Sequence, residues 1–395
     1  MVIMNIDKIR KDFPLIQDYT YFDNACMTIK PYSVIEAVDE YYHSYPVCGG
    51  GRVPNILTNK VDEKIERGRE SVKELINADS IEELVFTKNT TEGINLVSRG
   101  LNLNKGDVVL STNKEHNSNL APWIQLREEV DIEYEQVPFK ENGDLNLEIL
   151  KEKMNSDVKL ISMVHTSNVD GTTIPASAVA DIAHDYDALF MLDGAQSVPH
   201  KPFDVKKEKI DILNFSIHKM LGPTGVGILY ASEEILESLT PLAVGGGSVV
   251  ESTYKDIDLH ETPQKFECGL QNYSGLCGVE EAVNYLMDIG LENIDKHEEK
   301  LNKYVTERLK DKVNLIGPED YKKRSGIFNF NIDDKSAEEV ARHLEKNNII
   351  VRFGRNCAYS WYNSQDIKEG VRASFYIYNS MKEAEKFVDV MEEII

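Results

Sequence analysis

The sequence predicts an α/β protein with a large domain, built on a mostly parallel sheet flanked by helices, and a smaller α+β C-terminal domain. From about residue 83 to residue 200, short β-rich runs alternate with helical stretches, which is typical of βα units. After about residue 275, long helical stretches replace this alternation. The 395 residues also suffice for two domains, each with its own core.

The composition excludes several classes of function. A net charge of -23 argues against nucleic acid and against an anionic membrane surface as partners, because both need a basic face. The five cysteines are an odd number without a C-x-x-C pair, which predicts neither a disulfide framework nor a metal site. The N-terminus lacks a signal-peptide core, and no run approaches the about 18 apolar residues of a membrane span. We therefore expect a cytoplasmic protein that does not bind membranes.

Five β-rich runs of the large domain each precede a helical stretch. The runs cover residues 83–87, 106–112, 132–138, 158–165 and 188–193, and the helical stretches cover residues 91–101, 117–130, 146–154, 176–186 and 194–200. Polar side chains stand where the strands end, namely Thr90, Thr91, His116, Asn168, Asp193 and Ser216. Because open α/β sheets bind ligands at the carboxyl ends of their strands, one site could collect all of them.

The second part of the chain begins with residues 278–311, which read as one long helix or two in tandem. Further patterns predict β-rich runs at 326–332, 349–354 and 370–379 and helices at 336–348 and 382–394. We assign residues 16–285 to the large domain and residues 1–15 and 286–395 to the small domain. Cys357 lies in the small domain, so its thiol would have to meet the large domain's site across a cleft.

Lys219 follows the apolar run 212–215, stands beside His218 and precedes the turn-forming stretch LGPTGVG. A lysine at the end of a buried strand is unfavourable unless it is paired or used covalently. For this lysine alone, an ordinary ion pair or a contact with a helix C-terminus is the favoured interpretation.

Neighbouring segments favour a cofactor. Asp193 ends the preceding strand and Gln196 follows it, and a carboxylate there can keep a pyridinium nitrogen protonated, as pyridoxal 5'-phosphate (PLP) chemistry requires. Thr90 and Thr91 open a helix, where backbone N–H groups and the helix dipole favour a phosphate. His116 is available to stack on a heteroaromatic ring. Such residues often only cap helices, but together they indicate a PLP site.

These residues also carry a resemblance to a known family. The matching stretches run from residue 21 to residue 378 and are YFDNAC, FTKNTTEGINL, EHNSNLAPW, HTSNVDGT, LDGAQSVPH, FSIHKMLGPTGVGILY, GGGS, FECGLQN, VRFGRNCA and GVRASFYIYN. The sequence resembles class V of the fold-type I PLP enzymes, and most closely the group II cysteine desulfurases, which include selenocysteine lyases. The resemblance implies the fold-type I architecture, with a seven-stranded sheet in the large domain.

The resemblance implies a role for each candidate residue. Lys219 would hold PLP covalently and move the substrate's α-proton, Asp193 would pair with the pyridinium nitrogen, Gln196 would bond the phenolic oxygen, and His116 would stack on the ring. The phosphate would be held by Thr90, Thr91, Ser216 and His218. The substrate carboxylate would bind to Asn168 and to Arg372, the latter as a bidentate fork, with Arg352 also in the substrate site.

Cys357 matches the nucleophile of the group II enzymes, which sits in a short R-x-G-x-x-C loop formed here by Arg352, Gly354 and Cys357. Arg352 and Arg355 would favour the thiolate. The thiolate would attack the sulfur of L-cysteine and leave alanine and a persulfide on Cys357, with selenocysteine as the alternative substrate. The implied protein is a homodimeric cysteine desulfurase that passes sulfur to an acceptor or iron–sulfur scaffold protein.

Two departures and two alternatives accompany this interpretation. Leu270 stands where many relatives have a threonine that reaches the partner subunit's phosphate, and Gly51, before Arg52, stands where group II enzymes often have a histidine. One alternative is a class V enzyme for another amino acid: a selenocysteine lyase, cysteine-sulfinate desulfinase, epimerase or C–S lyase. The other is an α/β scaffold without PLP, although its glycine clusters match no nucleotide-binding motif.

Overall fold

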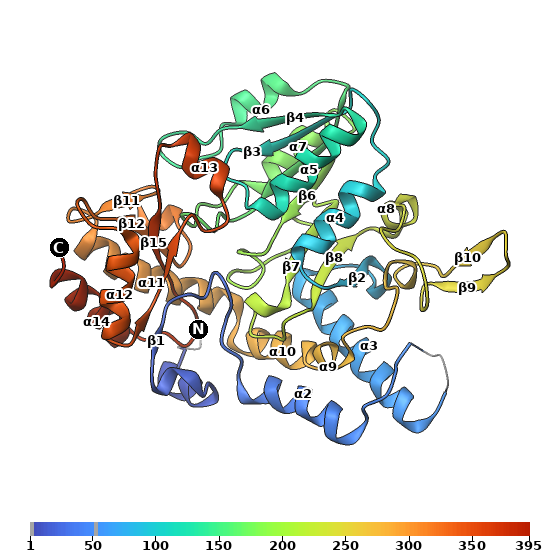
Figure 1. Cartoon of the computed structure of the whole chain (residues 1–395), viewed down its shortest axis with the longest axis horizontal. Coiled ribbons are helices and arrows are strands. Elements are labelled where there is room, and N and C mark those ends of the chain that lie inside the picture. The colour runs from blue at the N-terminus through green and yellow to red at the C-terminus, as the bar shows by residue number, and fades with distance from the viewer. Residues whose placement is uncertain (1–3, 51–53) are drawn as a thin grey trace.

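A seven-stranded sheet forms the centre of the protein in the computed structural model, which describes residues 4–50 and 54–395 (Figure 1). Its strand order is β2-β8-β7-β6-β5-β3-β4. The strands are β2 (Leu84–Thr87), β3 (Val108–Thr112), β4 (Glu133–Val137), β5 (Val158–Val164), β6 (Leu189–Asp193), β7 (Ile212–Ser216) and β8 (Gly227–Ala231). The strands β3 to β7 pair in parallel, and β8 runs antiparallel to both of its neighbours. The predicted fold class, with a mostly parallel seven-stranded sheet, is confirmed.

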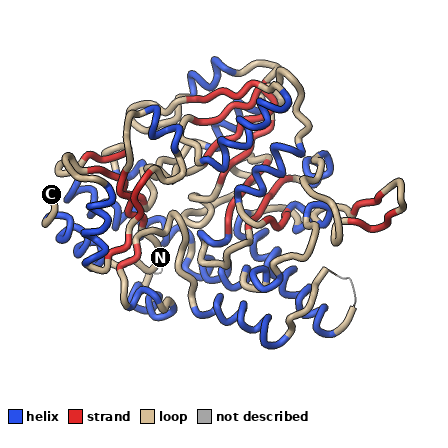
Figure 2. The backbone as a smooth tube through the Cα atoms, viewed as in Figure 1, coloured by secondary structure: helices blue, strands red, loops and turns tan. Residues whose placement is uncertain are grey.

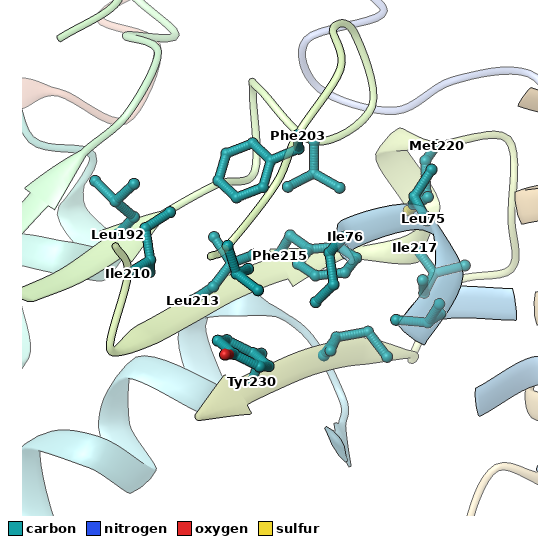
Figure 3. Packing of buried hydrophobic residues seen from close by; sticks show 14 of the residues in the cluster. Leu75, Ile76, Leu192, Phe203, Ile210, Leu213, Phe215, Ile217, Met220 and Tyr230 are labelled. Atoms are coloured by element: carbon teal, nitrogen blue, oxygen red, sulfur yellow. The ribbon is translucent and has the colours of Figure 1, made fainter. Parts of the chain in front are cut away.

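Both faces of this sheet are largely buried, since successive residues of a strand point to opposite faces and nearly all residues of the strands other than β4 are buried. On one face the strand residues pack against α3 (Ile56–Ile76), α6 (Leu147–Lys153), α7 (Ala176–His184) and α10 (Val279–Ile289), and on the other against α4 (Thr90–Gly100), α5 (Asn117–Val130) and α8 (Glu233–Ser238). Figure 3 shows the first face, where Leu213 and Phe215 of β7 meet Ile76 of α3. The near-continuous apolar runs of the sequence reflect this double burial.

A four-stranded antiparallel sheet forms the small domain. Its order is β11 (Asn314–Ile316), β12 (Ile327–Asn331), β15 (Gly370–Ser374) and β14 (Arg352–Gly354). The helices α11 (Leu291–Leu309), α12 (Ala337–Lys346) and α14 (Met381–Glu392) share a separate core with these strands. The helix α10 and the helix α11 are the predicted tandem pair, interrupted at Gly290. The smaller α+β domain is therefore present (Figure 1).

The N-terminal segment contacts both parts of the molecule. Its strand β1 (Thr20–Tyr21) pairs with β13 (Ile349–Ile350), while Phe13 packs against Tyr285 and Tyr378. The exact division of the chain into residues 16–285 and residues 1–15 with 286–395 stays a prediction.

Several local features differ from the sequence-based prediction, and one of them is that β15 ends at Ser374 although the β-rich run was predicted to continue to residue 379. Residues 194–200 form turns instead of a helix, because the segment is short and contains Gly194 and Pro199. The run 349–354 divides into β13 and β14, which pair with different partners. The hairpin of β9 (Val249–Ser252) and β10 (Ile257–Leu259), which projects from the body (Figure 2), was not predicted.

The remaining described helices are α1 (Ile6–Ile9), α2 (Tyr32–Ser44), α9 (Tyr273–Leu276) and α13 (Tyr359–Ser364). Of the helices in the described ranges, none combines the length and the apolar character needed to cross a bilayer. The positions Gly51 and Arg52, at which we noted a departure from the group II pattern, lie outside the described residues.

Candidate functional site

A cavity of about 230 Å³ lies at the carboxyl ends of the parallel strands, where the two domains meet. All the predicted site residues line it: Thr90, Thr91, His116, Asn168, Asp193, Gln196, Ser216, His218, Lys219, Arg352, Cys357 and Arg372. The large domain supplies the first nine, and Arg352, Cys357 and Arg372 come from the small domain. The structure thus brings the predicted set together, while the role of each member stays a prediction.

Lys219 reaches the cavity from a single 3₁₀ turn, Ile217–Lys219, which follows directly on β7. Its amine makes no hydrogen bond or ion pair with any residue in the described part of the chain, unlike an ordinary structural lysine. Burial lowers the pKa of this amine, the nearby Asp193 opposes the shift, and the Arg372 guanidinium adds to it. An unpaired amine of lowered pKa is suited to covalent chemistry.

Asp193 ends β6 and faces the same space. One carboxylate oxygen, Oδ1, accepts the Ala195 N–H at 3.0 Å, and the other has no partner among the residues that the structure describes. Burial raises the pKa of this carboxyl, and the Lys219 amine and the hydrogen bond from the Ala195 N–H oppose the shift. A cationic ring nitrogen would therefore find a carboxylate whose charge is not yet compensated.

The N-terminus of α4 borders the other side of the cavity. The Asn89 side chain caps it by accepting the Glu92 N–H at 2.9 Å. The Thr90 N–H donates to Ser216 Oγ at 2.8 Å, and the two hydroxyls lie 2.6 Å apart, so that the helix start is tied to the end of β7. Hydroxyls at a helix N-terminus suit a phosphate group.

The two histidines of the site are neutral at pH 7. Burial, aided by Lys219, Arg372 and Arg352, lowers the pKa of His116 to about 3, and its Nδ1 accepts the Ser118 N–H at 3.1 Å. Burial, aided by Lys219 and Lys30, lowers the pKa of His218 to about 4. A neutral imidazole can stack on an aromatic ring without bringing a second charge into the cavity.

Sequence reasoning missed Asp23, which joins the two cavity arginines. Its Oδ1 accepts a hydrogen bond from Arg372 Nη2 at 3.2 Å, and its Oδ2 accepts one from Arg352 Nε at 3.3 Å. Arg372 Nη1 also donates to the Asn168 carbonyl at 2.9 Å, while its Nε is buried without a partner in the described chain. Asp23 lies in the stretch YFDNAC, but no local pattern distinguished it from a turn residue.

Arg352 and Arg355 were both expected near the Cys357 thiol, but only Arg352 lies there. Arg352 lines the cavity with the thiol. Arg355 points elsewhere, because its guanidinium donates to the Lys368 carbonyl and to Asn363 Oδ1, both at 3.0 Å. A second thiol, that of Cys26, also lines the cavity.

The residues of the cavity fit PLP. The uncompensated Asp193 oxygen matches a pyridinium nitrogen, the free Lys219 amine matches an aldehyde, and the start of α4 with Ser216 matches a phosphate. Gln196 is held in place by its Nε2–H donation to the Ala25 carbonyl at 2.6 Å.

Comparison with known proteins identifies the family of this chain. The chain belongs to the aminotransferase class-V family, whose family model matches residues 20–387. It is 37% identical to a probable cysteine desulfurase of Pyrococcus abyssi, over 98% of this chain and 97% of the relative. It is 36% identical to a cysteine desulfurase of Haloferax volcanii, over 98% of this chain and 96% of the relative. The apo structure of a cysteine desulfurase from Thermococcus onnurineus superposes with a TM-score of 0.96 at 36% identity, covering 100% of this chain and 99% of that one.

Proposed function

We propose that this protein is a PLP-dependent cysteine desulfurase, which converts L-cysteine to L-alanine and keeps the sulfur as a persulfide on Cys357. One observation carries the proposal: a thiol from the small domain and an unpaired amine from the large domain line the same cavity. The full-length similarity to proteins named cysteine desulfurases supports it.

The cofactor is pyridoxal 5'-phosphate, and Lys219 holds it covalently. Asp193 pairs with its ring nitrogen, His116 stacks on the ring, and Gln196 binds the phenolic oxygen. Thr90, Thr91, Ser216 and His218 hold the phosphate. When bound, the cofactor withdraws electrons from the bonds around the substrate's α-carbon, which makes them easier to break.

Arg372 and Asn168 orient the substrate by its carboxylate. Arg372 is pre-aligned by Asp23 and by the Asn168 carbonyl, so its fork loses little freedom when a carboxylate binds. Arg352, which donates to the other carboxylate oxygen of Asp23, keeps positive charge beside Cys357. The substrate sulfur then lies on the side of the cavity that the small domain supplies.

Two residues carry the chemical steps. The Lys219 amine removes the substrate's α-proton, because burial lowers its pKa and so favours the unprotonated, basic amine. The Cys357 thiolate attacks the substrate sulfur, the new S–S bond forms, and the C–S bond breaks with its electron pair left on carbon. That carbon takes up a proton and becomes the methyl group of alanine.

Replacing the thiol tests the assignment. We predict that Cys357→Ser abolishes alanine formation from L-cysteine but keeps the yellow cofactor, which borohydride should fix to Lys219. Cleavage of selenocysteine or cysteine sulfinate should survive, since neither leaving group needs a thiol acceptor. Cys48→Ser is the matched control, because Cys48 is exposed and does not line the cavity.

The outcomes separate the alternatives. Desulfuration by Cys357→Ser at the parental rate would show that the thiol is not the acceptor. A parent protein active only on selenocysteine or sulfinate would be a class V enzyme of different specificity. A colourless protein that cannot be reconstituted with PLP would be a scaffold and not an enzyme.

We further propose that the protein is a cytoplasmic homodimer that passes its persulfide sulfur to an acceptor or iron–sulfur scaffold protein. A reducing compartment suits its cysteines, all five of which are free thiols. A groove next to Leu270 and the exposed apolar side chains of Leu270 and Val250 support the dimer.

A further inference from the structure

The backbone around Cys357 has an unusual conformation. Gly354 has φ of 110°, and Asn356 and Cys357 follow with φ of 49° and 56°. Glycine adopts positive φ freely, and asparagine does so more readily than most residues, but two successive non-glycine residues there are strained. Strain of this kind persists only where the surroundings hold it in place.

Two hydrogen bonds hold the loop from the large domain. The Cys357 carbonyl accepts the Asn117 N–H at 2.7 Å, at the start of α5. The Asn356 carbonyl accepts from Asn168 Nδ2 at 2.6 Å. Both carbonyls of the strained pair therefore face large-domain donors, and the conformation of the pair decides which way the Cys357 side chain points.

A third support comes from Tyr362 in the small domain. Its hydroxyl accepts a hydrogen bond from Asn356 Nδ2 at 3.0 Å and another from Asn329 Nδ2 at 2.8 Å. The Asn329 amide also donates to the Val169 carbonyl at 2.9 Å. The Tyr362 side chain is fully buried, so neither amide can exchange this oxygen for bulk water.

The Tyr362 hydroxyl thus joins three parts of the molecule. Asn329 belongs to β12 of the small domain, Val169 follows β5 of the large domain, and Asn356 precedes the thiol. Val169 and Ala358 also pack against the tyrosine ring in one small apolar cluster. The contact spans the cleft between the domains, and it reaches Cys357 through a single residue.

We propose that Tyr362 is a positioning residue for Cys357: its hydroxyl holds Asn356 in the left-handed conformation and so directs the thiol toward the substrate sulfur. The inference rests on the proposed function, since it concerns how the acceptor thiol is aimed. Asn356 and Cys357 line the cavity, whereas Tyr362 is not among its lining residues, so Tyr362 acts on the site only through Asn356.

The test removes the hydroxyl and keeps the ring. In Tyr362→Phe holoenzyme, single-turnover persulfide formation on Cys357 should fall about tenfold, the size of effect expected when buried amides lose a hydrogen-bond acceptor. PLP content and the absorbance change on mixing with L-cysteine should stay as in the parent, because the large domain's part of the site is untouched. A uniform loss of stability would not produce this split.

Tyr359→Phe is the matched control. Tyr359 lies on the same helix, α13, and is 50% exposed, so losing its hydroxyl should change nothing. Asn356→Gly supplies a second variant, since glycine accepts the left-handed conformation but cannot bond Tyr362. Its effect on persulfide formation should not add to that of Tyr362→Phe, because both substitutions remove the same hydrogen bond.

Hydrogen exchange measures how firmly the Cys357 loop is held, independently of enzyme activity. Peptides covering residues 354–364 should take up deuterium faster in Tyr362→Phe than in Tyr359→Phe or the parent. A folded Tyr362→Phe protein with parental persulfide formation and exchange would overturn the inference, as would equal losses of persulfide formation and of the cofactor's absorbance response. A parent that forms no persulfide on Cys357 would instead refute the proposed function, and the exchange data would still show whether Tyr362 holds the loop.

Discussion

Some residues of the site could be predicted from the sequence, and others could not. Lys219 follows a buried strand and Asp193 ends one, where a charged side chain is unfavourable without a partner, so together with their neighbours they are recognisable as site residues. Asp23 and Tyr362 have no such setting. Asp23 meets Arg352 and Arg372 across 329 and 349 residues of chain, and Tyr362 acts through amides that ordinary turns also contain. Contacts of this kind exist only once the domains have met.

Asp193 should matter more for turnover than for cofactor binding. We predict that Asp193→Asn lowers the rate of alanine formation at least about a hundredfold, since an amide cannot compensate a cationic ring nitrogen and preorganised charge is worth that much. PLP content should stay near the parental value, because the phosphate and Lys219 attachments remain.

Steady-state assays with absorbance measurement of bound cofactor give both quantities. Asp185→Asn, an exposed substitution at the end of α7, is the control. Parental turnover with intact cofactor content would contradict the role assigned to Asp193.

At the scale of elements, the order of strands and helices followed from hydrophobic patterning. Strands of four to seven residues, buried on both faces, leave continuous apolar runs, and the helices between them keep their amphipathic period. The pairing partners of the strands could not be predicted, because nothing in residues 349–354 indicates that β13 pairs with β1 while β14 pairs with β15. The direction of a strand could not be predicted either, since β8 has the same apolar pattern as the parallel strands but runs antiparallel to its neighbour β7.

The start of α4 offers a prediction at this scale. Asn89 and Asn146 are both half-buried N-caps, of α4 and α6, but only Asn89 lines the cavity. Either alanine substitution should lower the free energy of unfolding by about 1 kcal/mol. Only Asn89→Ala should also weaken PLP binding, by about fivefold, because it loosens the helix turn that faces the phosphate.

Denaturant unfolding of the apoproteins and titration with PLP measure the two effects separately. Equal PLP affinity in the two variants would show that the start of α4 does not hold the phosphate.

At the scale of the whole molecule, the complete site could not be predicted from local sequence patterns, because two domains contribute to it. The large domain alone presents the Lys219 amine, the Asp193 carboxylate and the helix start proposed to hold the phosphate, and the order of βα units predicts where all three lie. The thiol and both arginines arrive from the small domain, and their approach depends on Asp23, Asn168 and Tyr362 bridging the cleft. Only the family resemblance predicted that these small-domain residues would lie beside the large-domain residues, because local patterns in the chain do not show which distant segments come together.

A groove of about 940 Å³ lies on another face, between α3 and the segment 259–276. Val250 lines it and is 60% exposed, and Leu270, which stands between the lining residues Gly269 and Gln271, is 71% exposed. The Gln271 side chain cannot replace the missing threonine in this conformation, because its amide donates to the carbonyls of Glu267 and Cys268. Exposed apolar patches of this kind mark protein interfaces, and a second copy of the chain is the partner we propose.

Leu270→Asp should therefore shift the protein from dimer to monomer. A buried, unpaired carboxylate at an interface is strongly unfavourable, so the dimer's dissociation constant should rise at least about a hundredfold. Size-exclusion chromatography with light scattering over a concentration series measures it. Tyr186→Asp adds the same charge at a 44% exposed aromatic site outside the groove and should leave the dimer intact. If Leu270→Asp stays dimeric at the concentrations at which the parent does, this face is not the subunit interface, and the proposed dimer must form elsewhere.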